Sequence, residues 1–135
     1  MAVTFSEVAE IALGLPGVTE GTRFGNRTWL VGGKGFVWER PLSKADVRRL
    51  AGAPVPAGPL LAARVANMQE KDVLLMDPPD GFFDIEHFSG YPAVLVQLDV
   101  AAPEVVRAAI IEAWYCCAPP KLAAQGPPRG VRAGG

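Results

Sequence analysis

The residues best suited to chemistry lie between Gly21 and Arg40, where arginines and aromatic side chains alternate with apolar residues. Guanidinium groups donate to phosphate oxygens, and exposed aromatic rings stack on nucleobases. Because side chains alternate along a strand, a hairpin in this stretch is expected to carry six of them on one face. These are Arg27, Trp29, Val31, Phe36, Trp38 and Arg40. The pattern fits either a buried core face with charged margins or a platform for an anion.

Burial is the favoured interpretation for the aromatic residues of this face, Trp29, Phe36 and Trp38. Burying such a side chain is worth on the order of 1.5 to 3 kcal/mol, and a chain of 135 residues needs large apolar residues inside. Cations at the edges of the sheet can still reach phosphate groups. The candidates for nucleic-acid contact are Arg27, Lys34, Arg40 and Arg64.

The charge distribution bears on this hypothesis in two ways. The net charge is −1, whereas nucleic-acid binders commonly carry a basic surplus. However, residues 21–64 carry eight basic and two acidic residues, and residues 65–117 carry two basic and nine acidic ones. Such segregation forms a basic patch if the fold keeps the two segments apart.

His87, the only histidine, is the one residue that an enzyme hypothesis could use. Asp84 and Glu86 lie close to it in the sequence and could orient the imidazole as a general base. However, no serine or cysteine nucleophile motif accompanies it. We therefore expect a structural role for His87 and no catalytic residues.

No pattern of metal ligands or phosphate-binding glycines is evident. One histidine and the adjacent Cys116 and Cys117 cannot form a closed tetrahedral zinc site. The acidic residues of segment 77–86 lack the ligand spacing of a calcium-binding EF-hand. The glycines of Gly32 to Gly35 lack the flanking residues of a phosphate-binding loop and are better explained by a turn. We expect no metal and no cofactor.

The elements that position these residues follow from turn and capping signals. Gly32-Gly33 predicts a tight hairpin turn, in which Trp29 lies opposite Phe36; a four-residue loop would place it opposite Trp38. Capping boxes at Thr4 and Ser43 and a proline at Pro103 predict three helices. The helices are expected from Phe5 to Leu13, from Ser43 to Leu50, and from Pro103 to before Pro119. Further strands are expected at Leu60 to Ala66, Asp72 to Met76 and Ala93 to Leu98.

Helices at both ends of a run of strands predict an α+β fold, an antiparallel sheet with the N- and C-terminal helices packed on one face. We expect a single domain over residues 1–118 and a flexible Pro/Gly-rich tail over residues 119–135. No run is long and apolar enough to span a membrane, and the N-terminus lacks the basic start of a signal peptide. A cytoplasmic location with reduced thiols is expected.

Several short motifs recur in an order that resembles the MmcQ/YjbR family of small bacterial proteins. They are Leu15-Pro16-Gly17-Val18-Thr19-Glu20, Phe24-Gly25, Gly33-Lys34-Gly35-Phe36 and Gly90-Tyr91-Pro92 before an apolar strand. The resemblance implies a fold like that of CyaY, the bacterial frataxin, arranged as an α-β-α sandwich. It also implies a DNA-binding role described for a double-wing arrangement. By analogy with that fold, weak cation binding at acidic residues is a minor alternative.

The sequence thus favours a cytoplasmic accessory protein with weak, sequence-independent nucleic-acid binding through phosphate contacts. The alternative is a protein-interaction or small-ligand module without a nucleic-acid role, which the negative net charge supports. An enzyme that uses His87 is the least favoured hypothesis.

Overall fold

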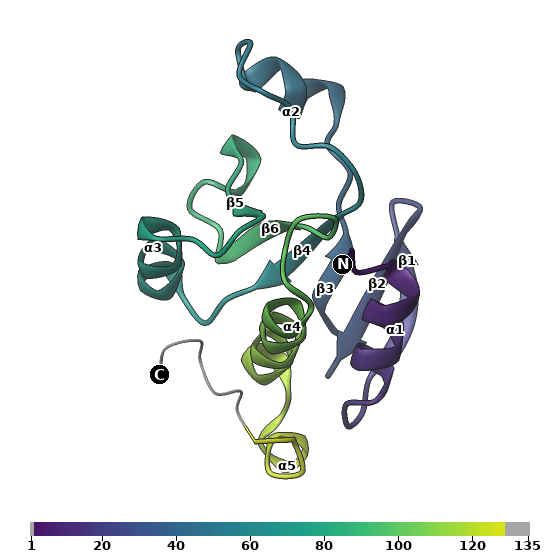
Figure 1. Ribbon diagram of the computed structural model, residues 1–135. Helices are drawn as coiled ribbons and strands as arrows, with labels where there is room; N and C mark the ends of the chain where they lie inside the picture. The colour runs from purple at the N-terminus through teal and green to yellow at the C-terminus, as the bar shows by residue number, and fades with distance from the viewer. Residues whose placement is uncertain (1, 129–135) are drawn as a thin grey trace.

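One six-stranded antiparallel sheet organises residues 2–128, which the computed structural model describes (Figure 1). The strand order is β1-β2-β3-β4-β6-β5. The strands are β1 (Thr19–Arg23), β2 (Asn26–Val31), β3 (Lys34–Glu39), β4 (Leu60–Arg64), β5 (Phe82–Phe83) and β6 (Ala93–Gln97). The helices are α1 (Phe5–Leu13), α2 (Lys44–Arg49), α3 (Met68–Met76), α4 (Pro103–Cys117) and α5 (Pro120–Ala123), with a 3-10 turn η1 (Glu86–Phe88). The predicted α+β class is confirmed.

The terminal helices α1 and α4 cover one face of the sheet (Figure 1). Helix α1 contacts β2 and α4, and α4 contacts β3 and β4. Between them lies the main core, whose largest buried members are Trp29, Phe36, Leu61, Ile110 and Trp114. Trp114 Nε1 donates to the Pro16 carbonyl at 3.0 Å, which ties α4 to the segment after α1. The two helices therefore cover this face of the sheet.

The predicted helix starts are confirmed in detail. Thr4 and Glu7 form a reciprocal capping box at α1, and Ser43 and Asp46 form another at α2. In each box, two side chains accept hydrogen bonds from two backbone amides that have no acceptor within the helix. Helix α4 begins at Pro103, where the missing amide hydrogen costs no hydrogen bond within the helix.

The strand predicted at Asp72 to Met76 is wrong, because these residues belong to α3. The side chain of Asn67 caps this helix by accepting from the Glu70 amide at 2.8 Å. Lys71, one turn later, is 1 % exposed and fastens the helix to the segment that follows. The alternation of Val73 and Leu75 was therefore misleading, and the cap at Asn67 was the relevant signal.

Both predicted hairpin registers are wrong, although the two-residue turn at Gly32-Gly33 is confirmed. Both glycines have positive φ, +59° and +77°, as this turn requires. A bulge shifts the register, so that Trp29 lies opposite Val37 and Phe36 is the extra residue. As a result Trp38, paired with Thr28, lies on the face opposite to Trp29.

A second, smaller cluster occupies this other face over β4 and β6. Its buried members are Ala62, Ile85, Phe88, Ala93 and Leu95, with Trp38, Leu42, Phe83 and Tyr91 packed against them. The segment 82–91 thus covers one half of the face. In the other half, over β1 to β3, Thr19 and Arg23 are exposed, Gly21, Asn26 and Leu30 are half-buried, and Thr28 and Gly35 are buried. We call this half the open face.

The chain continues past the domain boundary predicted at residue 118 with the short helix α5. Leu122 packs against the main core, and the Tyr115 hydroxyl donates to the Pro127 carbonyl. The remainder of the predicted tail, residues 129–135, lies outside the described residues.

Candidate functional site

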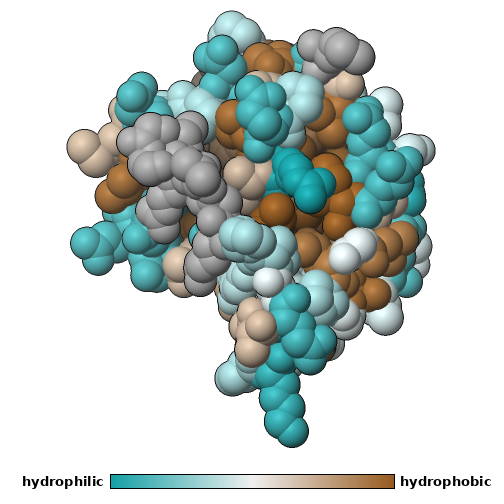
Figure 2. Space-filling model, turned by 60° about the horizontal axis from the view of Figure 1, so that its bottom comes forward, coloured by the Kyte–Doolittle hydropathy of each residue, from teal (hydrophilic) through white to brown (hydrophobic). Residues whose placement is uncertain are grey.

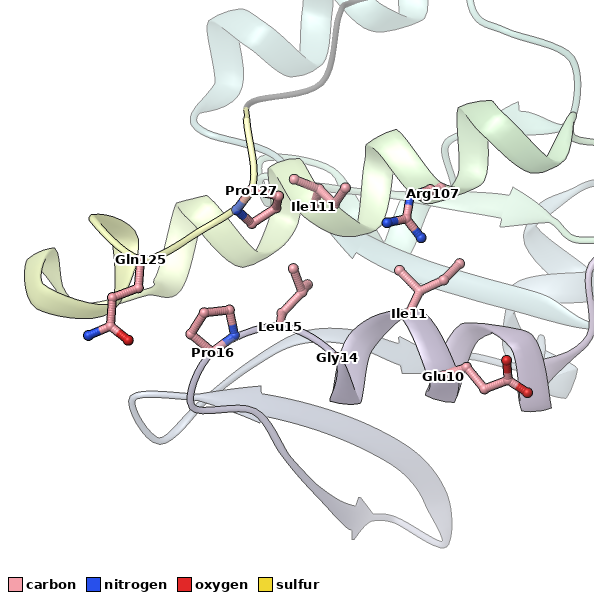
Figure 3. A pocket seen from close by; sticks show the side chains of 9 residues that line it. All are labelled: Glu10, Ile11, Gly14, Leu15, Pro16, Arg107, Ile111, Gln125 and Pro127. Atoms are coloured by element: carbon pink, nitrogen blue, oxygen red, sulfur yellow. The ribbon is translucent and has the colours of Figure 1, made fainter.

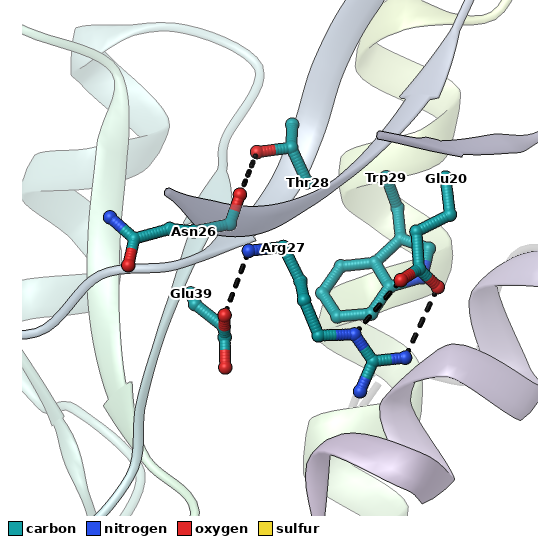
Figure 4. Close-up of polar contacts among 6 residues, drawn as sticks. All are labelled: Glu20, Asn26, Arg27, Thr28, Trp29 and Glu39. Atoms are coloured by element: carbon teal, nitrogen blue, oxygen red, sulfur yellow. Dashed lines mark hydrogen bonds and ion pairs between the residues drawn. The ribbon is translucent and has the colours of Figure 1, made fainter. Parts of the chain in front are cut away.

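Arg27, the first of the predicted cations, is paired with a carboxylate (Figure 4). Its Nε donates to Glu20 Oε2 at 2.9 Å and its Nη2 to Oε1 at 3.2 Å. Trp29 Nε1 donates to the same carboxylate at 3.0 Å, and the guanidinium lies 5.1 Å from the Trp29 ring centroid. The hydrogen bond from Arg27 is the largest influence on the pKa of Glu20, which is lowered. The positive charge of Arg27 is therefore neutralised by Glu20 of β1.

Arg40 is also paired, at the entrance to α2. Its Nη1 lies 2.9 Å from Asp46 Oδ2, and its guanidinium lies 5.6 Å from the Phe88 ring centroid. Asp46 is 3 % exposed. Burial raises the pKa of Asp46, but hydrogen bonds from Ser43 and Arg40 outweigh it, so the pKa is lowered. Arg40 therefore holds α2 against η1.

Arg64 and a residue that the prediction omitted, Arg23, approach the same glycine on the open face. Arg64 Nε donates to the Gly35 carbonyl at 2.8 Å, and its guanidinium lies 5.4 Å from the Tyr91 ring centroid. Arg23 extends from β1, and its Nη1 lies 4.0 Å from the point where a Cβ on Gly35 would stand. Two guanidinium groups from β1 and β4 thus flank one residue of β3.

The charges of this group are uncompensated. None of the ion pairs formed within residues 2–128 involves Arg23, Lys34 or Arg64. Arginines without an acidic partner can form paired, charge-assisted hydrogen bonds to phosphate or carboxylate oxygens. The arrangement can therefore bind an anion.

Gly35 keeps this surface flat. A Cβ at this position would lie 3.0 Å from Thr28 Cγ2, closer than ordinary van der Waals contact allows. A larger residue would also stand between the two arginines. The glycine that the sequence assigned to a turn is thus part of the floor of the candidate site.

Lys34 begins β3 and is exposed. Its strand partner is Val31, a member of the main core, so Lys34 lies on the α4 side of the sheet. Burial raises the pKa of the Cys117 thiol, while the positive charges of Arg64 and Lys34 act in the opposite direction. Lys34 is therefore not one of the cations of the open face.

The aromatic residues divide between the two faces. Trp29 and Phe36 are fully buried, which confirms the interpretation that they belong to the core. Trp38 and Tyr91 are half-buried at the border of the open face. The backbone of Tyr91 is held by Lys71, whose Nζ donates to its carbonyl at 2.8 Å and to that of Phe88 at 2.6 Å.

His87 is exposed in η1, and its ring contacts Phe88 at a centroid distance of 6.0 Å. The ring is therefore not buried in the core. Asp84, which could have oriented the imidazole, instead lies 3.0 Å from Lys71 Nζ. Within residues 2–128, no group of three or more His, Cys, Asp or Glu side chains is placed to hold a metal ion.

A cavity of about 320 Å³ lies between α1, α4 and the segment after α5 (Figure 3). Apolar side chains of Ile11, Leu15 and Ile111 line it, with the charged Glu10 and Arg107. Figure 2 shows this lower end of the molecule, where hydrophobic surface surrounds hydrophilic groups. The cavity is remote from the open face, because α1 and α4 cover the opposite side of the sheet.

The model of the YjbR family matches residues 13–116, from the end of α1 almost to the end of α4. The chain belongs to the YjbR family. Uncharacterized proteins of Mycobacterium bovis and Mycobacterium tuberculosis are each 40% identical to this YjbR protein over 121 residues. These alignments cover 88% of this chain and 92% of each relative. No solved structure matches the chain. In the part of this YjbR protein that the structure describes, no helix has the length and apolar character needed to cross a membrane.

Proposed function

We propose that this YjbR protein is a cytoplasmic accessory protein that binds nucleic acid weakly and without sequence preference. The contact surface is the open face, with Arg23 and Arg64 as its cations. The observation that carries the proposal is the approach of two unpaired guanidinium groups to Gly35. Phosphate groups are the ligands that such a pair suits, and contacts to phosphates carry no base information.

Three of the cations nominated from the sequence, Arg27, Lys34 and Arg40, are not part of this surface. Arg27 is neutralised by Glu20 and Arg40 by Asp46, so releasing either to a phosphate would break an existing ion pair. The two cations of the open face, Arg23 and Arg64, predict weak binding. The logarithm of the association constant should fall against the logarithm of the salt concentration with a slope of roughly −2.

The test is a salt titration of fluorescence anisotropy with a labelled oligonucleotide. The variant Arg23→Gln/Arg64→Gln should bind at least about 10-fold more weakly than wild type at about 50 mM salt and show a flatter salt dependence. Neither side chain fills the core, so the variant should fold normally.

The matched control is Lys44→Gln/Arg48→Gln, which removes two exposed charges of the same basic segment from α2. Its binding curve should follow that of wild type. Equal weakening in both double variants would mean that only net charge matters, and no association of wild type would rule out the proposal.

Small-ligand binding without a nucleic-acid role is the second candidate function, and the cavity between α1 and α4 favours it. Its volume of about 320 Å³ falls in the range of small-molecule sites, which are mostly apolar with a few polar groups. The lining combines apolar side chains with Glu10, Arg107 and Gln125, a mixture that suits a small amphipathic ligand. An oligonucleotide titration that shows no association would support this candidate function.

A further inference from the structure

The turn between β1 and β2 carries an aromatic side chain that the described fold does not use. Phe24 is fully exposed, at 101 % of its reference surface. Its φ of +53° lies in the left-handed region, which side chains with a Cβ rarely adopt. Phe24 and Gly25 form a two-residue turn that closes the pair of Arg23 with Asn26.

The same chain shows how such a turn is built without strain. At the next hairpin, both positive-φ positions are glycines, Gly32 and Gly33. Asparagine, aspartate and glycine are the residues that two-residue turns of this kind favour. A phenylalanine is strained there, and because Phe24 is fully exposed, no burial within residues 2–128 offsets the strain. An unexplained strained residue at the surface is a reason to look for a binding partner.

The surroundings of Phe24 indicate what kind of partner fits. Its neighbours Thr22, Arg23, Gly25 and Asn26 are polar or lack a side chain, so the ring is an isolated apolar group. A protein or membrane contact normally requires a contiguous apolar patch or several apolar side chains. A single aromatic ring next to a cation is instead the arrangement of single-strand binding surfaces, in which rings stack on bases and cations follow the backbone.

Arg23 connects this ring to the open face. Consecutive Cα atoms are about 3.8 Å apart, so Arg23 and Phe24 present a guanidinium and a ring from adjacent positions. The Arg23 guanidinium lies toward Gly35, where Arg64 approaches from the other side. A strand that contacts Arg23 can continue to the β1–β2 turn, which directly follows this residue, and one of its bases can then meet Phe24.

We propose that Phe24 stacks on an unpaired base of single-stranded nucleic acid whose phosphates contact Arg23 and Arg64. This inference rests on the proposed function and specifies its ligand as a single strand. In a duplex the bases are already stacked on one another, so the ring gains no contact without unstacking a step. Single strands should therefore bind more tightly than duplexes of the same sequence.

The test compares wild type with Phe24→Asn, using a single strand that contains 2-aminopurine, whose fluorescence falls when it is stacked. Asparagine tolerates positive φ, so the variant should melt at the same temperature as wild type or higher. Wild type should quench the probe. Phe24→Asn should remove the quenching and weaken single-strand binding at least about 5-fold. Phe24→Trp, which keeps an aromatic ring, should quench the probe and bind the single strand as wild type does.

The matched control is Met76→Asn, which removes another exposed apolar side chain, at 83 % exposure, from the end of α3. It should leave affinity and quenching unchanged. Equal affinity and quenching in Phe24→Asn and wild type would overturn this inference while leaving the proposed function standing. No wild-type association with any oligonucleotide would overturn both.

A third arm replaces the oligonucleotide with vesicles of phosphatidylcholine and phosphatidylglycerol. Neither wild type nor Phe24→Asn should sediment with these vesicles. Co-sedimentation of wild type that Phe24→Asn abolishes, together with unchanged oligonucleotide binding, would assign the ring to a lipid surface and overturn the inference.

Discussion

Glu20 illustrates how single residues divide the arginines into structural and available ones. Its carboxylate accepts from Arg27 and from Trp29 Nε1, and so fixes a cation and a buried indole at once (Figure 4). Arg23, in the same strand, has no such partner among the described residues. Sequence reasoning could not separate the two, because the distinction depends on which residues β1 places opposite β2.

Replacing Glu20 with alanine should destabilise the fold by about 1 to 3 kcal/mol, because the fully buried Trp29 loses the acceptor for its indole N–H. Arg27→Ala removes only a partly exposed ion pair and should cost less than about 1 kcal/mol. Urea denaturation of both variants at neutral pH checks the difference. Equal losses would show that the ion pair, rather than the indole hydrogen bond, is what Glu20 contributes.

The same carboxylate predicts a pH dependence. Since the folded state lowers the pKa of Glu20, the unfolded chain takes up its proton first as pH falls. The stability that the Glu20 charge adds should be present above the ordinary glutamate pKa of about 4.3 and be lost as pH falls through the lower folded value. The stability difference between wild type and Glu20→Gln should therefore shrink from neutral pH to about pH 3. A difference that stays constant over this range would contradict the assignment.

At the scale of elements, local signals predicted the positions of α1, α2 and α4, and long-range pairings decided the rest. Capping boxes and prolines act within a few residues, so their helices appear where expected. The bulge at Phe36 has no such local signal, yet it moves Trp38 to the other face. The open face was therefore not predictable, because it depends on that register and on which half of the sheet segment 82–91 covers.

Lys71 could not be identified from the sequence either, because its role depends on a segment 13 to 20 residues away. Replacing it with methionine leaves Asp84 and two carbonyls without their donor, which should cost roughly 1 to 3 kcal/mol. The amide of Tyr91, which donates to the Phe88 carbonyl, should exchange faster with solvent.

The control for this prediction is Lys44→Met, which changes an exposed lysine of α2 and should remain within about 0.5 kcal/mol of wild type. Hydrogen exchange of segment 82–91 and urea denaturation check both variants. Unchanged exchange in Lys71→Met would show that the loop is held by its apolar packing alone.

At the scale of the whole molecule, the fold leaves one sheet surface available. Helices α1 and α4 close one face, and segment 82–91 closes half of the other (Figure 1). Ion pairs to Glu20 and Asp46 neutralise part of the basic segment that the sequence showed. Its remaining cations on the open face, Arg23 and Arg64, are the basis of the binding proposed for a chain of net charge −1.

The most direct measurement is a two-dimensional ¹⁵N–¹H NMR titration of the protein with an unlabelled single-stranded oligonucleotide. A ligand bound between Arg23 and Arg64 should cause large, salt-sensitive shifts of the amides of Gly21 and Gly35. The amides of Ile11 and Ile111, at the cavity on the opposite side of the sheet, should remain in place. Shifts confined to α1 and α4, with Gly21 and Gly35 unmoved, would contradict the assignment of the open face as the binding surface.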